Sequence, residues 1–363
     1  MSASRDIRAG ARNLLINCAE LSGAESLLIV REDPDLGWYD GQTAAAVADA
    51  ARTVGITPTT LDVGAPQNSR GFGLTQAMAD HECTVFMSRI GDQDRFADPG
   101  LGKKTIMCYA RDANQLASAY GQTHHKAMLQ LKKAINDVLL GAKNVRVTCP
   151  LGTDISGDTT DTVKETATDV SVRRFPMGVP QPLDASRMSG QVVLARYLTP
   201  TGSKSYEPPS VPIHQTVMAD VSNGRITGLT GDADDVERIR NQYRRVAGLF
   251  NLDPDIVHSF HAGIHPGSTY ADAADDDPDR WSNSTFTNPR TLHFHTCGNY
   301  PPGEICWMVI DHTLRVDGKS LWRDGRLCVD DFDPTARCLA EWPELRPLFD
   351  SPSRTIGLLD LER

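Results

Sequence analysis

Apolar and polar positions follow two different patterns along this chain, and the change falls near residue 145. Before it, short apolar runs alternate with amphipathic stretches of helical period. The apolar runs predict strands at 26–30, 57–64, 83–88 and 103–110. The amphipathic stretches predict helices at 5–21, 40–55, 73–82 and 112–141. Strands separated by helices imply a parallel sheet with helices on both faces, so we expect an α/β domain over residues 1–143.

The second part of the chain carries the alternating pattern of half-buried strands. Such runs lie at 144–156, 191–199, 214–232, 288–298, 306–319 and 320–329. The sequences SNGR (222–225) and VDGK (316–319) are typical of hairpin turns. One helix is predicted at 232–251, because its acidic first turn and basic later part suit the helix dipole. We therefore expect an α+β domain with mostly antiparallel strands over residues 144–363.

Composition restricts the class of protein. A chain of 363 residues is too long for one simple core, which favours two domains. A formal net charge of -10 argues against nucleic acid as a partner. The chain has no run of about 18 apolar residues and no cleavable apolar leader, so neither a membrane span nor secretion is expected. Eight cysteines without a CxxC pair are typical of reduced thiols, and we expect a cytoplasmic protein.

Histidines are concentrated in one stretch of the second domain. Six of the ten fall between residues 258 and 312: His258, His261, His265, His293, His295 and His312. Histidine is the commonest metal ligand and titrates nearest neutral pH, so chemistry is expected here. In HFH (293–295) the two histidines share one face of a strand, because strand side chains alternate with a period of two. They are well placed to share a metal ion, and the alternative is a face that is merely solvated.

Two neighbouring segments add candidate ligands. HAGIH (261–265) holds two histidines in what we expect to be a glycine-bearing loop, because Pro266 and the nearby glycines exclude a helix interior. Asp311 closes the apolar run CWMVIDH. Its carboxylate could complete a two-histidine, one-carboxylate site of the kind that binds iron(II). The alternative for Asp311 is a strand-end residue that faces a turn.

Two further residues are candidates for handling a substrate. Tyr300 follows His293 by seven residues and could donate a proton or stabilise an oxyanion, or could simply pack. Arg89 follows a predicted strand at the edge where α/β folds bind ligands, and could hold a substrate carboxylate. The alternative in that segment is a surface ion pair between Asp92 and Arg95.

Several common catalytic motifs are missing from the sequence. No GxGxxG follows the first predicted strand, and no GxxxxGK[ST], GxSxG or HExxH occurs. These absences argue against a dinucleotide-binding Rossmann domain, a P-loop, a serine hydrolase and a standard zincin.

Six blocks of the second half resemble the aminopeptidase T family of metallopeptidases in order and rough spacing. They are NVRVTCPLGTDIS (144–156), RRFPMGVPQPL (173–183), SNGRITGLTGD (222–232), HAGIHP (261–266), TLHFHTCGNY (291–300) and TLRVDGKSLWRDGRL (313–327). The resemblance covers residues 145–330. It implies the fold of a superfamily that also contains 2,5-dihydroxypyridine 5,6-dioxygenase, an iron(II) ring-opening enzyme. It also implies a homodimer, since relatives associate through the second domain.

Departures from the peptidase pattern point toward the dioxygenase. The peptidases carry a metal-binding glutamate after the glycine of the FPxG block, where this chain has Val179. They carry a second glutamate where the best match here is His261, and the dioxygenase shares both departures. The loss of two acidic bridges disfavours a pair of metal ions.

The remaining part of the family pattern is matched only partly. His293 and Tyr300 have the spacing of the histidine and tyrosine in HxxxGxxY, with the glycine one residue later at Gly298, and the resemblance implies a ligand histidine and a catalytic tyrosine. The HxD ligand pair of both relatives is not present downstream. Asp311 is the nearest carboxylate, with Glu304 as an alternative, and His295 or His265 could replace it.

The first hypothesis is a mononuclear metal enzyme with His261, His293, His295 and Asp311 as candidate ligands. By resemblance, the ion would be iron(II), with zinc, manganese or cobalt as alternatives. The substrate would be a small aromatic or heteroaromatic ring that chelates the ion and is cleaved with dioxygen. Arg89 would hold a carboxylate, and Tyr300 or His265 would move protons. A metal-dependent hydrolase with a rebuilt site and a metal-free binding homologue are the alternatives.

Overall fold

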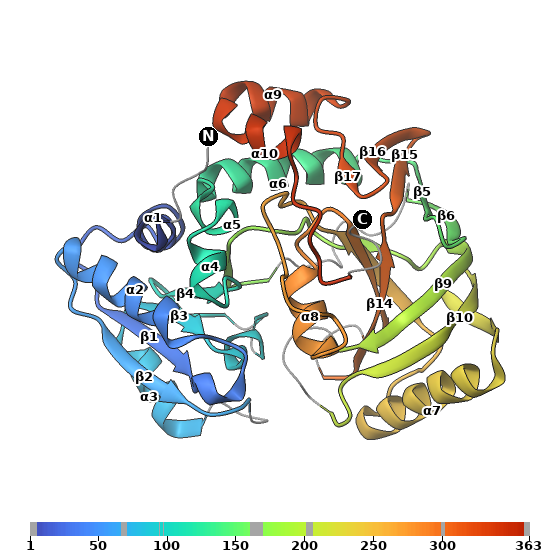
Figure 1. The fold of residues 1–363 in the computed structure, drawn as a ribbon, viewed down its shortest axis with the longest axis horizontal. Helices are drawn as coiled ribbons and strands as arrows, with labels where there is room; N and C mark the ends of the chain where they lie inside the picture. Colours follow the sequence, from blue (N-terminus) through green and yellow to red (C-terminus); the bar gives the residue numbers. More distant parts are fainter. Residues whose placement is uncertain are drawn as a thin grey trace. The chain divides into compact units, whose positions relative to one another are not determined.

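The chain folds into two compact units. The computed structural model describes residues 6–66, 71–93, 95–96, 98–159, 170–200, 206–298 and 302–358. Unit 1 comprises Met1–Gln130 and Asp169–Gly178, and unit 2 comprises Leu131–Thr168 and Val179–Arg363. The chain therefore enters unit 2, returns once to unit 1 and leaves it again. Figure 1 shows the elements of both units, and the domain limits of 143 and 144 remain a prediction from the sequence.

Unit 1 is built on a parallel sheet with strand order β2-β1-β3-β4-β7. The strands are β1 (Leu27–Glu32), β2 (Thr59–Val63), β3 (Cys83–Met87), β4 (Lys104–Cys108) and β7 (Arg173–Phe175). Each ladder of this sheet is parallel. The apolar runs form β1, β3 and β4 because strands buried on both faces need apolar residues at successive positions. The predicted α/β class is confirmed.

Helices of unit 1 lie between the strands in sequence. They are α1 (Ile7–Arg12), α2 (Gly41–Thr53), α3 (Gly71–Asp80), α4 (Ala113–Leu116), α5 (Ala119–Gln122) and the first part of α6 (His125–Leu140), with short helical segments η1 (Asn13–Cys18), η2 (Pro34–Leu36) and η3 (Arg89–Asp92). The helix predicted at 112–141 was wrong in one respect, since it is divided into three. Side chains of Asp112 and Ser118 accept hydrogen bonds from backbone N–H groups and start new helices there.

Unit 2 is built on an antiparallel sheet whose path runs β17-β16-β15-β5-β6-β9-β14-β13-β12-β8, with β10 on β9 and β11 on β10. The strands are β5 (Asn144–Thr148), β6 (Asp154–Asp158), β8 (Leu183–Asp184), β9 (Met188–Thr199), β10 (Val211–Ser222), β11 (Arg225–Thr230), β12 (Val257–Ala262), β13 (Thr291–Cys297), β14 (Glu304–Ile310), β15 (Thr313–Val316), β16 (Lys319–Arg323) and β17 (Arg326–Leu327). The predicted α+β class with mostly antiparallel strands is confirmed.

Two hairpins show how local sequence sets the register of this sheet. Asn223 and Gly224 have φ values of 47° and 67°, and they join β10 to β11. Asp317 and Gly318 have φ values of 49° and 85°, and they join β15 to β16. Positive φ at both central residues is the requirement of a type I′ turn, which Asn-Gly and Asp-Gly satisfy at low cost. Both predicted turns are confirmed.

The two faces of the β12–β13–β14 region are covered by different elements of unit 2. The helical segments of unit 2 are the rest of α6, α7 (Ala233–Phe250), α8 (Pro278–Thr285), α9 (Asp333–Glu341), η4 (Pro343–Leu345) and α10 (Arg346–Asp350). On one face, the Tyr243 hydroxyl of α7 bonds the Thr296 hydroxyl and accepts from the Trp307 indole. Trp281 of α8 packs with Cys306 and Met308 of β14, which lie on the other face because they alternate with Trp307.

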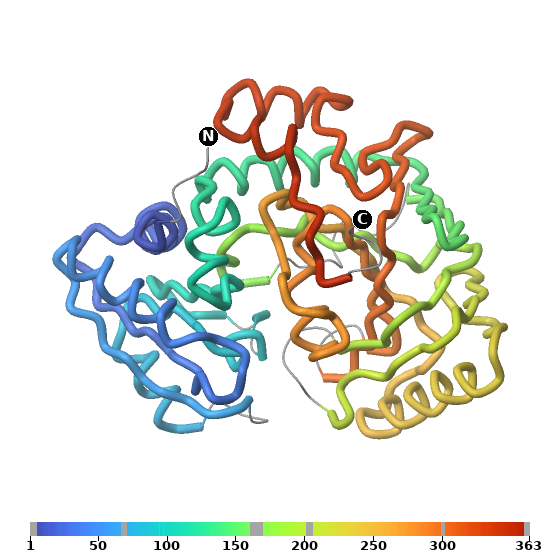
Figure 2. Tube along the Cα trace, viewed as in Figure 1, coloured from blue at the N-terminus to red at the C-terminus, as the bar shows by residue number. Residues whose placement is uncertain are grey.

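The last described segment of the chain lies alongside α8. The Trp281 indole donates to the carbonyl of Ile356, and Tyr270 pairs with Ile356 in a parallel bridge. Figure 2 shows this red C-terminal segment running beside the orange segment that precedes β13. Within the described residues, no helix has both the length and the apolar character needed to cross a membrane.

Candidate metal centre

Three histidines meet on one face of the antiparallel pair β12–β13. His261 lies directly opposite His293, and Ser259 lies directly opposite His295. Directly paired residues of an antiparallel ladder point to the same face, and residues two apart along a strand do so as well. The opposite face of this strand pair is apolar. There Phe260 and Phe294 lie opposite each other, with ring centroids 5.3 Å apart. The alternating pattern thus sends aromatic rings into the core and imidazoles to the other face.

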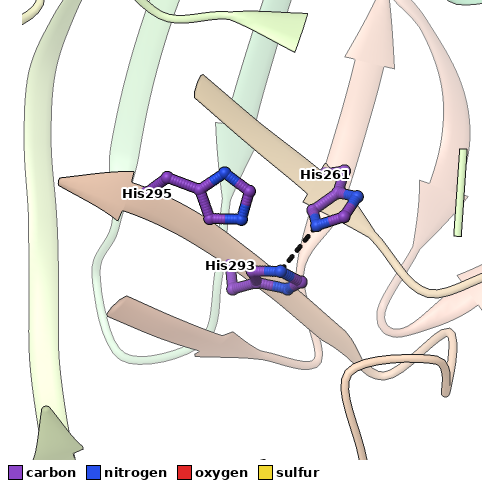
Figure 3. Close-up of side chains that lie close together, drawn as sticks. All are labelled: His261, His293 and His295. Carbon is purple, nitrogen blue, oxygen red and sulfur yellow. Dashed lines mark hydrogen bonds between the residues drawn. The ribbon is translucent and has the colours of Figure 1, made fainter. Parts of the chain in front are cut away.

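The imidazole rings form a compact triangle (Figure 3). The centroids are 4.1 Å apart for His261 and His293, 5.1 Å for His261 and His295, and 5.0 Å for His293 and His295. One ring nitrogen from each residue lies within 4.8 Å of the others. The three residues are buried, with exposed fractions of 7%, 4% and 9% in sequence order.

Hydrogen bonds outside the triangle fix which nitrogen of His261 faces it. The Nδ1–H of His261 donates to the backbone carbonyl of Pro180 at 3.3 Å, because a carbonyl oxygen can only accept. In the neutral ring, Nε2 carries the lone pair, and it points at Nε2 of His293, 2.6 Å away. The Pro180 carbonyl is held in turn, since the next residue, Gln181, donates its N–H to the side chain of Asn136.

The donor set fits a single divalent ion. Ligand nitrogens about 2.1 Å from a zinc-like ion stand roughly 3.4 Å apart at tetrahedral angles, so three nitrogens within 4.8 Å of one another can converge on one ion with small ring movements. Within the described part of the chain, this is the group that could hold an ion, and it contains no carboxylate. Three neutral imidazoles do not offset the positive charge of a divalent ion, so any compensating negative charge comes from further ligands.

His265 is not one of the three residues of this group. His261 belongs to β12 and not to the expected loop, so the loop of HAGIH begins only after Ala262. His265 is fully buried and its Nδ1 accepts from the N–H of Gly267 at 3.1 Å. Its backbone N–H donates to Thr287, which anchors the loop to the segment before β13.

The structure does not bring Asp311 to the histidines. Both oxygens of its carboxylate bind the guanidinium of Arg290, at 2.7 Å each, and one also accepts from Arg354 at 3.1 Å. Arg290 is 1% exposed, so this carboxylate neutralises a buried cation. Asp311 lies in the turn beyond β14, whose last residue is Ile310, and it is not one of the three residues of the group.

The remaining candidates lie elsewhere or outside the described residues. Arg89 is in unit 1, where its Nε and backbone N–H donate to Glu32 and its guanidinium stacks on Trp38, 4.3 Å from the ring centroid. The guanidinium of Arg89 also forms an ion pair with Glu32 at 2.6 Å, and its role toward a substrate carboxylate stays a prediction. Glu304, the alternative carboxylate, begins β14 and lies opposite Cys297, beyond the histidine group. Tyr300 lies outside the described residues.

Sequence reasoning missed two residues that contact the histidines. The hydroxyl of Ser259 lies 3.0 Å from Nδ1 of His295, and the Pro180 carbonyl accepts from His261. Ser259 precedes His261 by two positions, which puts the two on one face of a strand, but no strand was predicted there. Pro180 had no sequence signal, because its contact joins segments 81 residues apart.

Comparisons with known proteins support the fold. No family model matches the chain, and no curated protein matches its sequence. Among solved structures, 2,5-dihydroxypyridine dioxygenase from Pseudomonas putida KT2440 superposes with a TM-score of 0.59 at 12% identity, covering 91% of this chain and 98% of that one. AmpT, an aminopeptidase T from Thermus thermophilus, superposes with a TM-score of 0.50 at 12% identity, covering 90% and 99%. The resemblance expected from the sequence blocks is thereby confirmed at the level of the fold.

Proposed function

We propose that this protein is a mononuclear metal-dependent enzyme that acts on a small aromatic or heteroaromatic substrate as a ring-cleaving dioxygenase with iron(II). The observation that carries the proposal is the convergence of His261, His293 and His295 on one sheet face without a carboxylate among them. One such group fits one ion, whereas a pair of ions needs bridging acidic ligands to offset its charge. The fold shared with a dioxygenase supports the same proposal.

The three histidines would hold the ion, and their hydrogen bonds would orient them. His261 would present Nε2 because its Nδ1–H is committed to Pro180. The neutral ligand set would favour an anionic, chelating substrate such as a ring with ionisable hydroxyl groups, because no ligand charge offsets the ion. When bound, iron(II) supplies Lewis acidity and a route for coupling a ring to dioxygen. Tyr300 keeps its proposed role as a proton donor.

A metal-dependent hydrolase is the second candidate, and the same triad favours it. Three histidines with an open fourth position form a catalytic zinc site in known hydration chemistry. A zinc ion there would lower the pKa of a bound water and supply the nucleophile for hydrolysis. The fold shared with AmpT supports this candidate as well.

One set of measurements on untagged protein, purified without oxygen, separates the candidates. Metal analysis is combined with oxygen consumption on a panel of dihydroxypyridines and dihydroxybenzenes, and with hydrolysis of aminoacyl p-nitroanilides. We expect about one iron per chain and oxygen uptake with a ring substrate. Zinc together with hydrolysis would replace the first candidate by the second.

A third outcome concerns the metal-free binding homologue. Protein that binds no divalent ion in calorimetry after dialysis would overturn both enzyme candidates. The homodimer and the cytoplasmic location remain proposals, and light scattering at micromolar concentration tests the first of them.

A further inference from the structure

A serine hydroxyl lies against the ring of one candidate ligand. Ser259 is on β12, and its Oγ is 3.0 Å from Nδ1 of His295 on β13. The contact follows from the register, because Ser259 and His295 are directly opposite on the histidine-bearing face. Ser259 is half-buried, which shields this hydrogen bond partly from water.

The hydroxyl has a chemical consequence for the ring. An imidazole has two nitrogens, and a hydrogen bond at one of them restricts how the ring is turned and which nitrogen faces an ion. When Nδ1–H of His295 donates to Ser259, the lone pair is on Nε2. The Pro180 carbonyl also holds Nδ1 of His261, so partners outside the triangle orient two of the three rings.

We infer that Ser259 is a positioning residue that holds the ring of His295 in the orientation needed for metal binding. The inference rests on the proposed function, because it requires that the triad holds an ion. The hydroxyl itself is not a ligand: it acts on the ion only through His295. Loss of such outer partners costs about 10–100-fold in metal affinity in known sites.

The test uses full-length protein and the metal alone. Dissociation constants for Zn²⁺ and Co²⁺ are measured by chelator competition, and the visible absorption of bound Co²⁺ reports the ligand geometry. We expect Ser259→Ala to weaken binding by about 10–100-fold and to change the Co²⁺ spectrum. Ser259→Thr keeps a hydroxyl at this strand position, and it is expected to retain the wild-type metal affinity and Co²⁺ spectrum.

A matched control separates this effect from a general loss of stability. Ser156→Ala removes a half-buried serine from β6, four strands away in the same sheet. It should leave the affinity and the spectrum unchanged, and thermal unfolding of the metal-free variants shows whether each remains folded.

A folded Ser259→Ala protein with wild-type affinity and spectrum would overturn the inference, provided His261→Ala loses the ion. Wild-type protein that binds neither ion would overturn the proposed function and this inference with it.

Discussion

The Nε2 atoms of His261 and His293 face each other at 2.6 Å across the β12–β13 ladder. Because His261 donates its Nδ1–H to Pro180, its Nε2 accepts from His293 when the His261 ring is neutral. A metal ion would take the place of that single proton. The strand register makes this contact possible, since the two residues are directly opposite.

Replacing His293 tests the centre directly. His293→Ala removes one of the three candidate ligands, whose ring neighbours both of the others. We expect metal affinity to fall by more than the roughly 100-fold cost of losing a residue that only hydrogen-bonds to a ligand. His258→Ala is the control, because His258 lies on β12 next to Ser259 but bonds the carbonyl of Cys297 through Nε2. Metal content is measured by mass spectrometry after dialysis. Equal metal content in both variants would argue against the triad.

Asp311 is expected to matter for stability and not for metal binding. Asp311→Asn removes the charge that neutralises buried Arg290, which should lower the free energy of unfolding by about 3 kcal/mol. Asp330→Asn is the matched control, because it breaks the exposed pair with Arg346 and should cost no more than about 0.5 kcal/mol. Urea unfolding measures both, and metal content should be unchanged in each. Metal loss in folded Asp311→Asn protein would restore the carboxylate as a candidate ligand.

Complete burial lowers the pKa of His312 to about 3 from 6.5, against opposing effects of the Arg290 backbone and Asp311. The folded protein therefore keeps this ring neutral while the unfolded chain takes up a proton below pH 6.5. By linkage, stability is full above pH 6.5 and falls as the pH drops from 6.5 toward 3, by an amount on the order of 4 kcal/mol. The folded-state pKa is lowered, so acid favours the unfolded chain.

His312→Leu removes this titration and should flatten that part of the stability profile. Urea midpoints at several values between pH 7.5 and pH 4 compare the variant with the wild type. Parallel profiles for the two proteins would show that His312 does not contribute to the acid sensitivity.

Gly263 allows β12 to approach the segment before β13. A Cβ there would lie 2.2 Å from the carbonyl oxygen of Asn288 and 2.4 Å from the backbone of Thr287. Gly263→Ala must push these backbones apart, so we expect about 3 kcal/mol of destabilisation and weaker metal binding. Gly248→Ala is the contrast, because a Cβ on that helical glycine meets nothing within 4 Å. It should stabilise the protein by about 0.5–1 kcal/mol, as thermal unfolding would show.

Elements whose signals are local could be predicted well. The Asn223–Gly224 and Asp317–Gly318 turns were predicted because these residues adopt positive φ at low cost wherever they occur. The single helix expected at 112–141 was wrong because Asp112 and Ser118 cap new helices, and capping signals were outweighed by the apolar period. HAGIH was interpreted as a loop because Gly263 and Pro266 lie next to His261, although β12 extends through Ala262.

The sequence by itself determined the two fold classes and the shared face of His293 and His295, because periods of two and of 3.6 residues are properties of the local backbone. Tertiary structure alone decided that His261 completes their group and that Asp311 neutralises Arg290. Both outcomes depend on which strands and turns meet. The position of His261 is set by the register between distant strands. The pairing of Asp311 is set by the free-energy cost of leaving a buried guanidinium without a partner.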